Sequence, residues 1–220
     1  MRVGTDGVLL GAWADVEGAV RILDIGTGCG LIALMVAQRA PEAQVTGIDI
    51  DQPSVQQARE NIAASPFAKR MEITEADVRG YETAPFDRIL CNPPYHNETL
   101  LPPDARRAAA RHTQSLPLPE LIHHAARLLA PGGTLSLIIP TAAQTETSAA
   151  ATACGLMLTR LTQVHTTATK PPSRILAEWE KPAAGNATHR ALRTDTLTLT
   201  APDGKRTPEH EALTSEFYQW

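Results

Sequence analysis

The chain has 220 residues, of which 43% are apolar and only 4% aromatic, and its formal net charge is −4. This length and apolar content are enough for one α/β domain with an aliphatic core. A slightly acidic chain is not basic throughout, so any contact with nucleic acid has to come from a local patch of cations. There is no apolar run near about 18 residues, no secretory leader and no C-x-x-C pair, so we expect a soluble cytoplasmic protein without disulfides.

The first elements predict a helix, a strand, a glycine loop and a second helix in succession. A helix ending at Trp13 is followed by a buried strand from Val20 to Leu23. After the glycines, the apolar residues from Leu31 to Arg39 recur with the period of a helix, which ends near a proline. The segment from Gln44 to Ile48 then predicts a second strand, so the chain begins as a βαβ unit.

The glycine loop, Gly26-x-Gly28-x-Gly30, indicates a turn that binds a ligand. Alternating glycines let the backbone turn tightly and approach a ligand without a Cβ in the way. Asp49, with Asp51 as a competitor, follows the next strand at the spacing of ribose-binding acids. Nicotinamide and flavin enzymes favour G-x-x-G after the first pair, because a pyrophosphate must sit on the helix N-terminus. A cofactor with a ribose, an adenine and a charged amino-acid tail fits this spacing better.

Helices and strands continue to alternate along the rest of the chain, which is the pattern of an α/β fold. The helix from Pro117 to Leu129 is expected to break at Pro131-Gly132-Gly133. The strands Leu158 to Val164 and Ile175 to Glu180 have no helix between them, which suits an antiparallel hairpin at the edge of the sheet. The other expected elements are the helices Gln52 to Ala64, Ala142 to Cys154 and Pro208 to Tyr218, and the strands Met71 to Thr74, Phe86 to Leu90, Thr134 to Ile139 and Thr194 to Thr200.

A rigid elbow, Asn92-Pro93-Pro94-Tyr95, follows the strand that ends at Leu90. Each proline fixes its own φ and lacks an N–H, and Pro94 pushes Pro93 towards an extended shape. The Asn92 amide and two backbone carbonyls offer acceptors for a planar NH₂ group, and Tyr95 offers a ring on which a flat base can stack. Taken alone, the motif is equally compatible with a turn that only caps a strand. The glycine loop upstream favours catalysis.

Together, the glycine loop and the elbow resemble those of class I S-adenosylmethionine-dependent methyltransferases that act on planar nitrogens. Within that class, the segment Val3 to Trp13, the triplet Ala110-Arg111-His112 and the stretch Glu209 to Tyr218 resemble the bacterial tRNA1(Val) adenine-N6 methyltransferases. The similarity extends over nearly the whole chain. Members of that family usually carry further residues ahead of the Met-x-Val-Gly-Thr-Asp segment, whereas the sequence here starts with the Met1 of that segment.

The resemblance implies an α/β, Rossmann-like class I methyltransferase fold. Its sheet is expected to be seven-stranded and mostly parallel, with an antiparallel edge hairpin and helices on both faces. It also implies a single domain over residues 1–220, with the core sheet at about 19–182 and a C-terminal extension at 183–220. The implied cofactor is S-adenosyl-L-methionine, and its expected binding residues are Asp24, Gly26, Gly28, Gly30, Asp49, Asp77, Thr5 and Asp6.

Each implied acid has a role and an alternative. Asp24 is expected to face the cofactor ammonium through water, or else to fix the loop by a hydrogen bond. Asp49 is expected to accept both ribose hydroxyls, with Asp51 facing solvent. Asp77 is expected to accept from the adenine amino group, or else to be an exposed turn acid. Thr5 and Asp6 form a lid over the cofactor in this interpretation, unless Thr5 only caps the first helix.

The implied reaction is methylation of the N6 amino group of an adenine in tRNA, at position 37 beside the anticodon. Asn92, Pro93, Pro94 and Tyr95 are the expected catalytic residues. No metal is expected, because the seven histidines show no metal-ligand spacing. A monomer or a weak dimer is expected. The expected RNA contacts, for which ordinary solvated side chains are the alternative, are Arg106, Arg107, Arg111, His112, Lys170 and Arg174.

Other functions fit parts of the same pattern. Methyltransferases that act on the glutamine amide of release factors share the Asn-Pro-Pro-Tyr elbow, but they usually carry a helical N-terminal domain, for which there is no room before Thr5. A methyltransferase acting on another nucleobase amine, in rRNA or DNA, also remains open. A non-catalytic cofactor-binding or RNA-binding module is disfavoured, because the loop, the ribose acid and the elbow occur in one chain.

Overall fold

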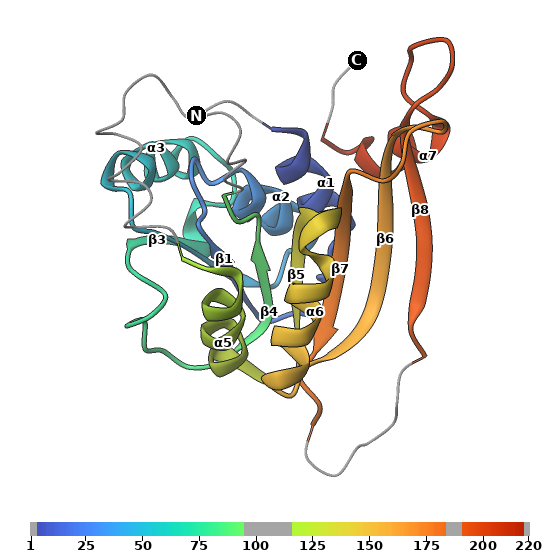
Figure 1. Ribbon diagram of the computed structural model, residues 1–220. Coiled ribbons are helices and arrows are strands. Elements are labelled where there is room, and N and C mark those ends of the chain that lie inside the picture. Colours follow the sequence, from blue (N-terminus) through green and yellow to red (C-terminus); the bar gives the residue numbers. More distant parts are fainter. Residues whose placement is uncertain (1–3, 95–115, 184–190, 218–220) are drawn as a thin grey trace, which may run out of the picture.

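The computed structural model describes residues 4–94, 116–183 and 191–217, and these form a mixed sheet with helices on both faces (Figure 1). The strand order is β3-β2-β1-β4-β5-β7-β6-β8. Only β7 runs antiparallel to its neighbours, β5 and β6. The strands are β1 (Arg21–Ile25), β2 (Gln44–Asp49), β3 (Met71–Glu75), β4 (Phe86–Cys91), β5 (Leu129–Pro140), β6 (Met157–Thr167), β7 (Arg174–Glu180) and β8 (Arg193–Thr200).

Two groups of helices cover the two faces of the sheet (Figure 1). One face carries α1 (Thr5–Trp13), α2 (Leu31–Arg39), α3 (Gln52–Ala63) and α7 (Pro208–Thr214), and the other carries α5 (Leu118–Leu128) and α6 (Gln144–Ala153). The short 3₁₀ turns η1 (Ala68–Arg70) and η2 (Thr141–Ala143) precede β3 and α6. Within the described residues, no helix is long and apolar enough to cross a bilayer.

The alternation of side chains along the central strands explains why both faces are covered. Ile89 and Leu137 pack on the face of α5 and α6, whereas their neighbours Leu90 and Ile138 pack on the face of α1 and α2. All four side chains are almost completely buried. Central strands that are apolar on both sides belong in a parallel sheet enclosed by helices, as the aliphatic composition predicts.

The resemblance is right about the class of fold, but two details of the sheet differ from it. There are eight strands in the described sheet rather than seven, because β8 pairs in parallel with β6. As a result, the β6–β7 hairpin is antiparallel as expected but does not form the edge. Trp13 shows how this side of the sheet is tied together: its indole N–H donates to Thr162 of β6 at 2.8 Å, and the Thr162 hydroxyl in turn contacts Asp195 of β8.

The Pro131-Gly132-Gly133 segment lies inside β5 rather than breaking a helix. The helix α5 ends at Leu128, and the register between β4 and β5 shifts between Phe86 and Arg88. Gly132 has a φ of 80°, and a Cβ on Gly133 would lie 2.9–3.0 Å from three backbone oxygens. Only glycines fit such a bulge, so the residues that predict a break instead permit a bent strand.

Candidate active site

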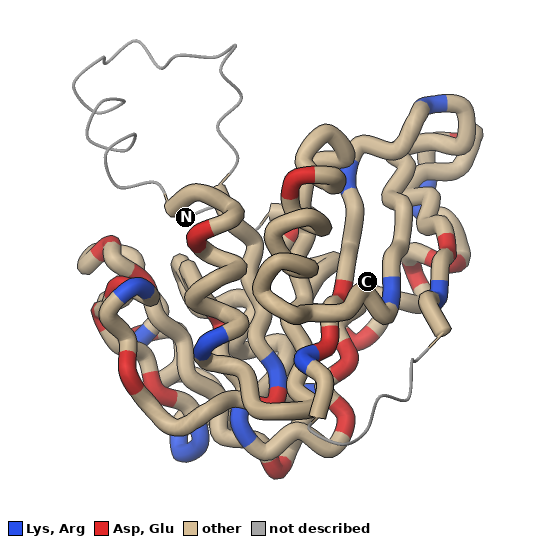
Figure 2. The backbone as a smooth tube through the Cα atoms, turned by 60° about the horizontal axis from the view of Figure 1, so that its bottom comes forward, with Lys and Arg blue, Asp and Glu red and all other residues tan. Residues whose placement is uncertain are grey.

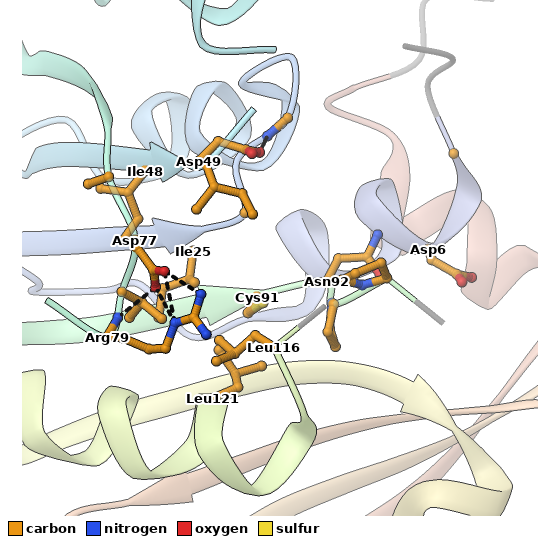
Figure 3. Close-up of a pocket in the computed structure, with 18 of the residues that line it drawn as sticks. Asp6, Ile25, Ile48, Asp49, Asp77, Arg79, Cys91, Asn92, Leu116 and Leu121 are labelled. Carbon is orange, nitrogen blue, oxygen red and sulfur yellow. Dashed lines mark hydrogen bonds and ion pairs between the residues drawn. The ribbon is translucent and has the colours of Figure 1, made fainter. Parts of the chain in front are cut away.

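A cavity of about 670 Å³ lies at the carboxyl ends of β1, β2, β3 and β4 (Figure 3). The strand order reverses between β1 and β4, and α/β sheets bind ligands at such a point. Residues from the loops after these four strands, from the start of α1 and from α5 line the cavity. They are Gly4, Thr5, Asp6, Ile25, Gly26, Gly28, Ile48, Asp49, Ile50, Ala76, Asp77, Val78, Arg79, Cys91, Asn92, Pro93, Pro94, Leu116 and Leu121.

The glycine loop forms one wall of the cavity. Gly26 and Gly28 line it with φ angles of 70° and 56°, a region that L side chains rarely adopt. The N–H groups of Gly26 and Thr27 both donate to the Ile48 carbonyl, so the loop is fixed to the end of β2. The third predicted glycine, Gly30, is not among the residues that line the cavity. It precedes α2 with a φ of 82°, a conformation that L side chains rarely adopt, and it packs beside Ala58 of α3.

Asp24 lies beneath this loop and is completely buried. Its Oδ2 accepts from the Thr27 hydroxyl at 2.7 Å and from the Ala33 N–H at 3.2 Å, which joins the loop to the first turn of α2. Its Oδ1 is buried and has no hydrogen-bond partner. Burial raises the pKa of the Asp24 carboxyl from 3.8 to about 7, although these two hydrogen bonds act in the opposite direction. Loop fixing, the predicted alternative, is therefore present in the structure.

Asp49 and Asp51, the two candidates for binding the ribose, lie in different surroundings. Asp49 lines the cavity, and its carboxylate accepts from the Gly28 N–H at 2.8 Å and from the Asp51 N–H at 2.9 Å. Asp51 is exposed and caps α3 by accepting from the backbone N–H and the hydroxyl of Ser54. Of the two candidates for the ribose, only Asp49 faces the cavity.

Asp77 lines the cavity near the start of the loop after β3, and it is paired with Arg79. The guanidinium of Arg79 donates to both carboxylate oxygens, with a shortest N–O distance of 2.5 Å (Figure 3). The hydrogen bonds from Arg79 lower the pKa of the Asp77 carboxyl. The predicted adenine acceptor is therefore an ionised carboxylate whose orientation is set by a cation.

The elbow lies at the other end of the cavity. Asn92 and Asp6 lie on the side opposite to Asp77 and Arg79 (Figure 3). Asn92, Pro93 and Pro94 all line the cavity directly after β4. A Cβ on Gly7 of α1 would lie 3.4 Å from Leu31 and 4.0 Å from the Asn92 side chain, both ordinary contact distances, so α1 packs directly beside the elbow. Tyr95, the last residue of the predicted motif, lies outside the described residues.

The predicted lid residues are the first two residues of α1, and both line the cavity. Thr5 does not cap α1, because the N-cap is Gly4 and no side chain makes a capping hydrogen bond. Asp6 accepts from Nε of Arg174 at 2.9 Å. Arg174, one of the predicted RNA contacts, therefore lies beside the cavity and is paired with Asp6 of the predicted lid.

The remaining predicted RNA contacts are only partly visible. Lys170 is exposed in the loop between β6 and β7. Figure 2 shows acidic and basic positions interspersed along the described chain, so its charges do not divide into an acidic and a basic half. The other four candidates lie outside the described residues: Arg106, Arg107, Arg111 and His112.

Several cavity residues were missed by the sequence reasoning. Ile48, Val78 and Leu121 give the cavity apolar walls near Asp77, and Arg79 adds a guanidinium. The apolar residues carry no signal beyond that of ordinary core positions. The spacing Asp77-x-Arg79 could have been recognised, because an aspartate often accepts from the N–H two residues further on. Here the Arg79 N–H does donate to Asp77, at 2.9 Å.

Comparison with known proteins assigns the fold and site to a family. The model of the methyltransferase small domain matches residues 7–171. The chain belongs to the methyltransferase small domain family. Two relatives within it are each named tRNA1(Val) (adenine(37)-N6)-methyltransferase. The one from Porphyromonas gingivalis is 46% identical over 99% of this chain and 89% of its own length, and the one from Tolumonas auensis is 42% identical over 99% and 90%. The resemblance predicted from the sequence is confirmed.

Solved structures agree with this methyltransferase fold. A predicted O-methyltransferase from Agrobacterium tumefaciens has a TM-score of 0.72 and 26% identity, and each chain covers 98% of the other. A Listeria monocytogenes protein assigned as a class I S-adenosylmethionine-dependent methyltransferase has a TM-score of 0.60 at 17% identity, covering 90% of this chain and 65% of its own. The chain is a methyltransferase, and S-adenosyl-L-methionine is its cofactor.

The residues around the cavity fit this cofactor. Asp24 does not line the cavity itself, but its unpartnered Oδ1 is a buried acceptor next to the glycine loop, which suits an ammonium group nearby. The position of a Cβ on Gly26 meets no atom within 4 Å, so the backbone faces open space there. The volume of about 670 Å³ lies within the usual range of cofactor sites. S-adenosylmethionine supplies an electrophilic methyl group on its sulfonium sulfur.

Proposed function

We propose that this methyltransferase methylates the N6 amino group of adenine 37 in tRNA1(Val). The observation that carries the proposal is the Asn92-Pro93-Pro94 elbow, which lines the cofactor cavity at the end opposite to Asp77. An elbow of this kind suits a planar amine held close to the cofactor. The relatives that bear the name of this activity are similar over 99% of the chain, which supports the same substrate.

Three acids are proposed to bind three different parts of the cofactor. Asp49 accepts hydrogen bonds from the ribose hydroxyls, because its carboxylate faces the cavity and retains lone pairs beyond its two backbone contacts. Asp24 supports the ammonium of the amino-acid tail from beneath Gly26 and Gly28. Asp77 accepts from the adenine amino group. Thr5 and Asp6 cover the cavity from the start of α1.

Asn92 and Pro93 are proposed to orient the target amine. An adenine amino nitrogen is a weak nucleophile, because its lone pair is delocalised into the ring. The side-chain oxygen of Asn92 and the Pro93 carbonyl accept its two N–H groups, which turns the lone pair out of the ring plane. Positive charge develops on this nitrogen as its bond to the methyl carbon forms and the carbon–sulfur bond breaks, which releases S-adenosylhomocysteine, and the fixed dipoles of Asn92 and Pro93 would stabilise that charge. The nitrogen then loses one proton to water, so alignment rather than a strong base drives the reaction.

The tRNA contacts are proposed to surround this opening. Tyr95 stacks on the target base, and Pro94 stiffens the chain between Tyr95 and the acceptors. Lys170 and Arg174 contact phosphates beside the cavity, together with Arg106, Arg107, Arg111 and His112. We further propose that residues 1–220 act as one cytoplasmic methyltransferase domain, as a monomer or a weak dimer.

Methyl transfer to defined substrates tests this function. The purified protein is incubated with labelled S-adenosylmethionine and an unmodified tRNA1(Val) transcript, and the RNA is digested to nucleosides for mass spectrometry. A transcript with guanine at position 37 is the matched control, and a release factor with its glutamine tests the protein substrate. We expect N6-methyladenosine only when adenine occupies position 37. Label in the release factor, or equal label in both transcripts, would overturn the proposal.

A further inference from the structure

We propose that Arg79 is a positioning residue that sets the cofactor's base specificity, by holding the Asp77 carboxylate as a fixed acceptor for the 6-amino group of adenine. The inference rests on the proposed function of Asp77. It concerns a side chain that lines the cavity but lies at the end away from the elbow (Figure 3). Arg79 therefore acts on cofactor recognition rather than on the target amine.

Contacts within the turn hold the carboxylate from one side. The Arg79 backbone N–H donates to Oδ1 of Asp77 at 2.9 Å. Nε donates to Oδ1 at 3.0 Å and to Oδ2 at 2.8 Å, and one terminal nitrogen donates to Oδ2 at 2.5 Å. A guanidinium fork that reaches both oxygens fixes the plane of a carboxylate, whereas a single donor leaves it free to rotate.

This turn is itself anchored to the rest of the site. The Ala76 N–H donates to the Asp49 carbonyl at 3.0 Å, so the acceptor for adenine is tied to the proposed ribose acid. From the other side, Arg127 of α5 donates to the carbonyls of Val78 and Tyr81 at 3.1 and 2.9 Å. The position of the turn thus depends on Arg127, whereas the orientation of the carboxylate depends on Arg79.

Stability alone does not account for the Asp77–Arg79 pair. Its two side chains are 39% and 44% exposed, and exposed ion pairs contribute little to folding. The pair nevertheless forms part of the cavity wall, among apolar side chains such as Val78 and Leu121. Those apolar side chains cannot distinguish a 6-amino group from a 6-oxo group. A fixed carboxylate can, because it accepts from the amino group and repels the oxygen.

Two ligands that differ only at this position test the inference. S-adenosylhomocysteine carries a 6-amino group, and S-inosylhomocysteine carries a 6-oxo group in its place. Binding of each is measured by calorimetry for the wild type and for Arg79→Gln, which keeps a polar side chain but loses the fork. We expect Arg79→Gln to lower the affinity for S-adenosylhomocysteine by about tenfold, the usual effect of losing one well-placed hydrogen bond. The affinity for S-inosylhomocysteine should change less than twofold, so the preference for the 6-amino ligand over the 6-oxo ligand should also shrink by about tenfold.

Arg127→Gln is the matched control, because it loosens the same turn without touching Asp77. It should weaken the binding of both ligands by the same factor, so the ratio of their affinities should stay at the wild-type value. A parallel loss in Arg79→Gln would overturn the inference, since Arg79 would then only support the turn. An unchanged preference in Asp77→Asn would refute the assignment of Asp77 as well. Neither result bears on methylation of adenine 37, which the transcript experiment decides separately.

Discussion

Asp24→Asn removes a buried carboxyl whose charge is costly in the folded protein. Burial raises the pKa of this group from 3.8 to about 7. At about 1.4 kcal/mol for each pH unit, the difference corresponds to about 4 kcal/mol, a large part of a typical domain's stability. Between the two pKa values, the folded protein binds a proton that the unfolded chain has released. Asp24 therefore stabilises the protein fully below pH 4, and this contribution is lost as the pH rises to about 7.

The assay is urea unfolding of the ligand-free protein at a series of pH values from 4.5 to 8.5. The difference in unfolding free energy between wild type and Asp24→Asn isolates this group, because other titrating residues are common to both. We expect the wild type to lose about 3 kcal/mol relative to the variant over this range, with little further change above pH 8. Asp51→Asn is the matched control, since it removes an exposed carboxylate that caps α3.

A pH-independent difference between the wild type and Asp24→Asn would refute this reasoning. An NMR titration of the Asp24 side-chain carbon tests the same claim in the wild type, even if the variant folds poorly. A midpoint near 4 would mean that the buried carboxyl is better solvated than its contacts with Thr27 and Ala33 indicate. If Asp24 faces the cofactor ammonium as proposed, saturating S-adenosylhomocysteine lowers this midpoint.

Two further substitutions probe β2, at Asp49, which lines the cavity, and at Gly47, which packs against Thr27 of the glycine loop. Asp49→Ala should weaken the binding of S-adenosylhomocysteine by about 1–3 kcal/mol in calorimetry, because it removes charge-assisted hydrogen bonds to the ribose. Asp51→Asn is the control, and equal affinities of the two variants for this ligand would show that Asp49 does not bind it. Gly47→Ala should lower the unfolding free energy by about 1–3 kcal/mol, measured by urea unfolding. Its Cβ would lie 2.6 Å from Ile73 and 2.8 Å from the Thr27 hydroxyl that bonds Asp24. A melting temperature equal to that of the wild type would show that β2 and the loop have room there.

Much of the fold could be predicted from local pattern. The helix predicted from Leu31 to Arg39 is found with those bounds, and the strand predicted from Gln44 to Ile48 extends one residue further. The apolar residues of such segments recur with one clear period, so the sequence alone predicts whether each segment is a helix or a strand. The pairing of β8 with β6 is not, because a Thr-rich strand gives no sign of its partner. It depends on contacts distant in sequence, such as that of Thr162 with Asp195.

The candidate site was predictable where residues follow parallel strands directly. Gly26 and Asn92 come just after β1 and β4, Asp49 is the last residue of β2, and the carboxyl ends of these three strands meet at one edge. Residues that reach the cavity through a turn or a helix, such as Arg79 and Leu121, were missed. Their approach depends on how the β3–β4 loop folds back and on how α5 packs, which no local pattern reveals.

Single-turnover methylation by Asn92→Ala tests the central claim most directly. Asn92 is proposed to act as the target amine reacts, so its loss should slow methylation of tRNA1(Val) by about 10²–10³-fold. Affinity for S-adenosylhomocysteine should stay near the wild-type value, because Asn92 lies at the end of the cavity away from Asp77 (Figure 3). Thermal melting verifies that the variant folds. Methylation by folded Asn92→Ala at the wild-type rate would contradict the account, and the elbow would then be only a stiff end of β4.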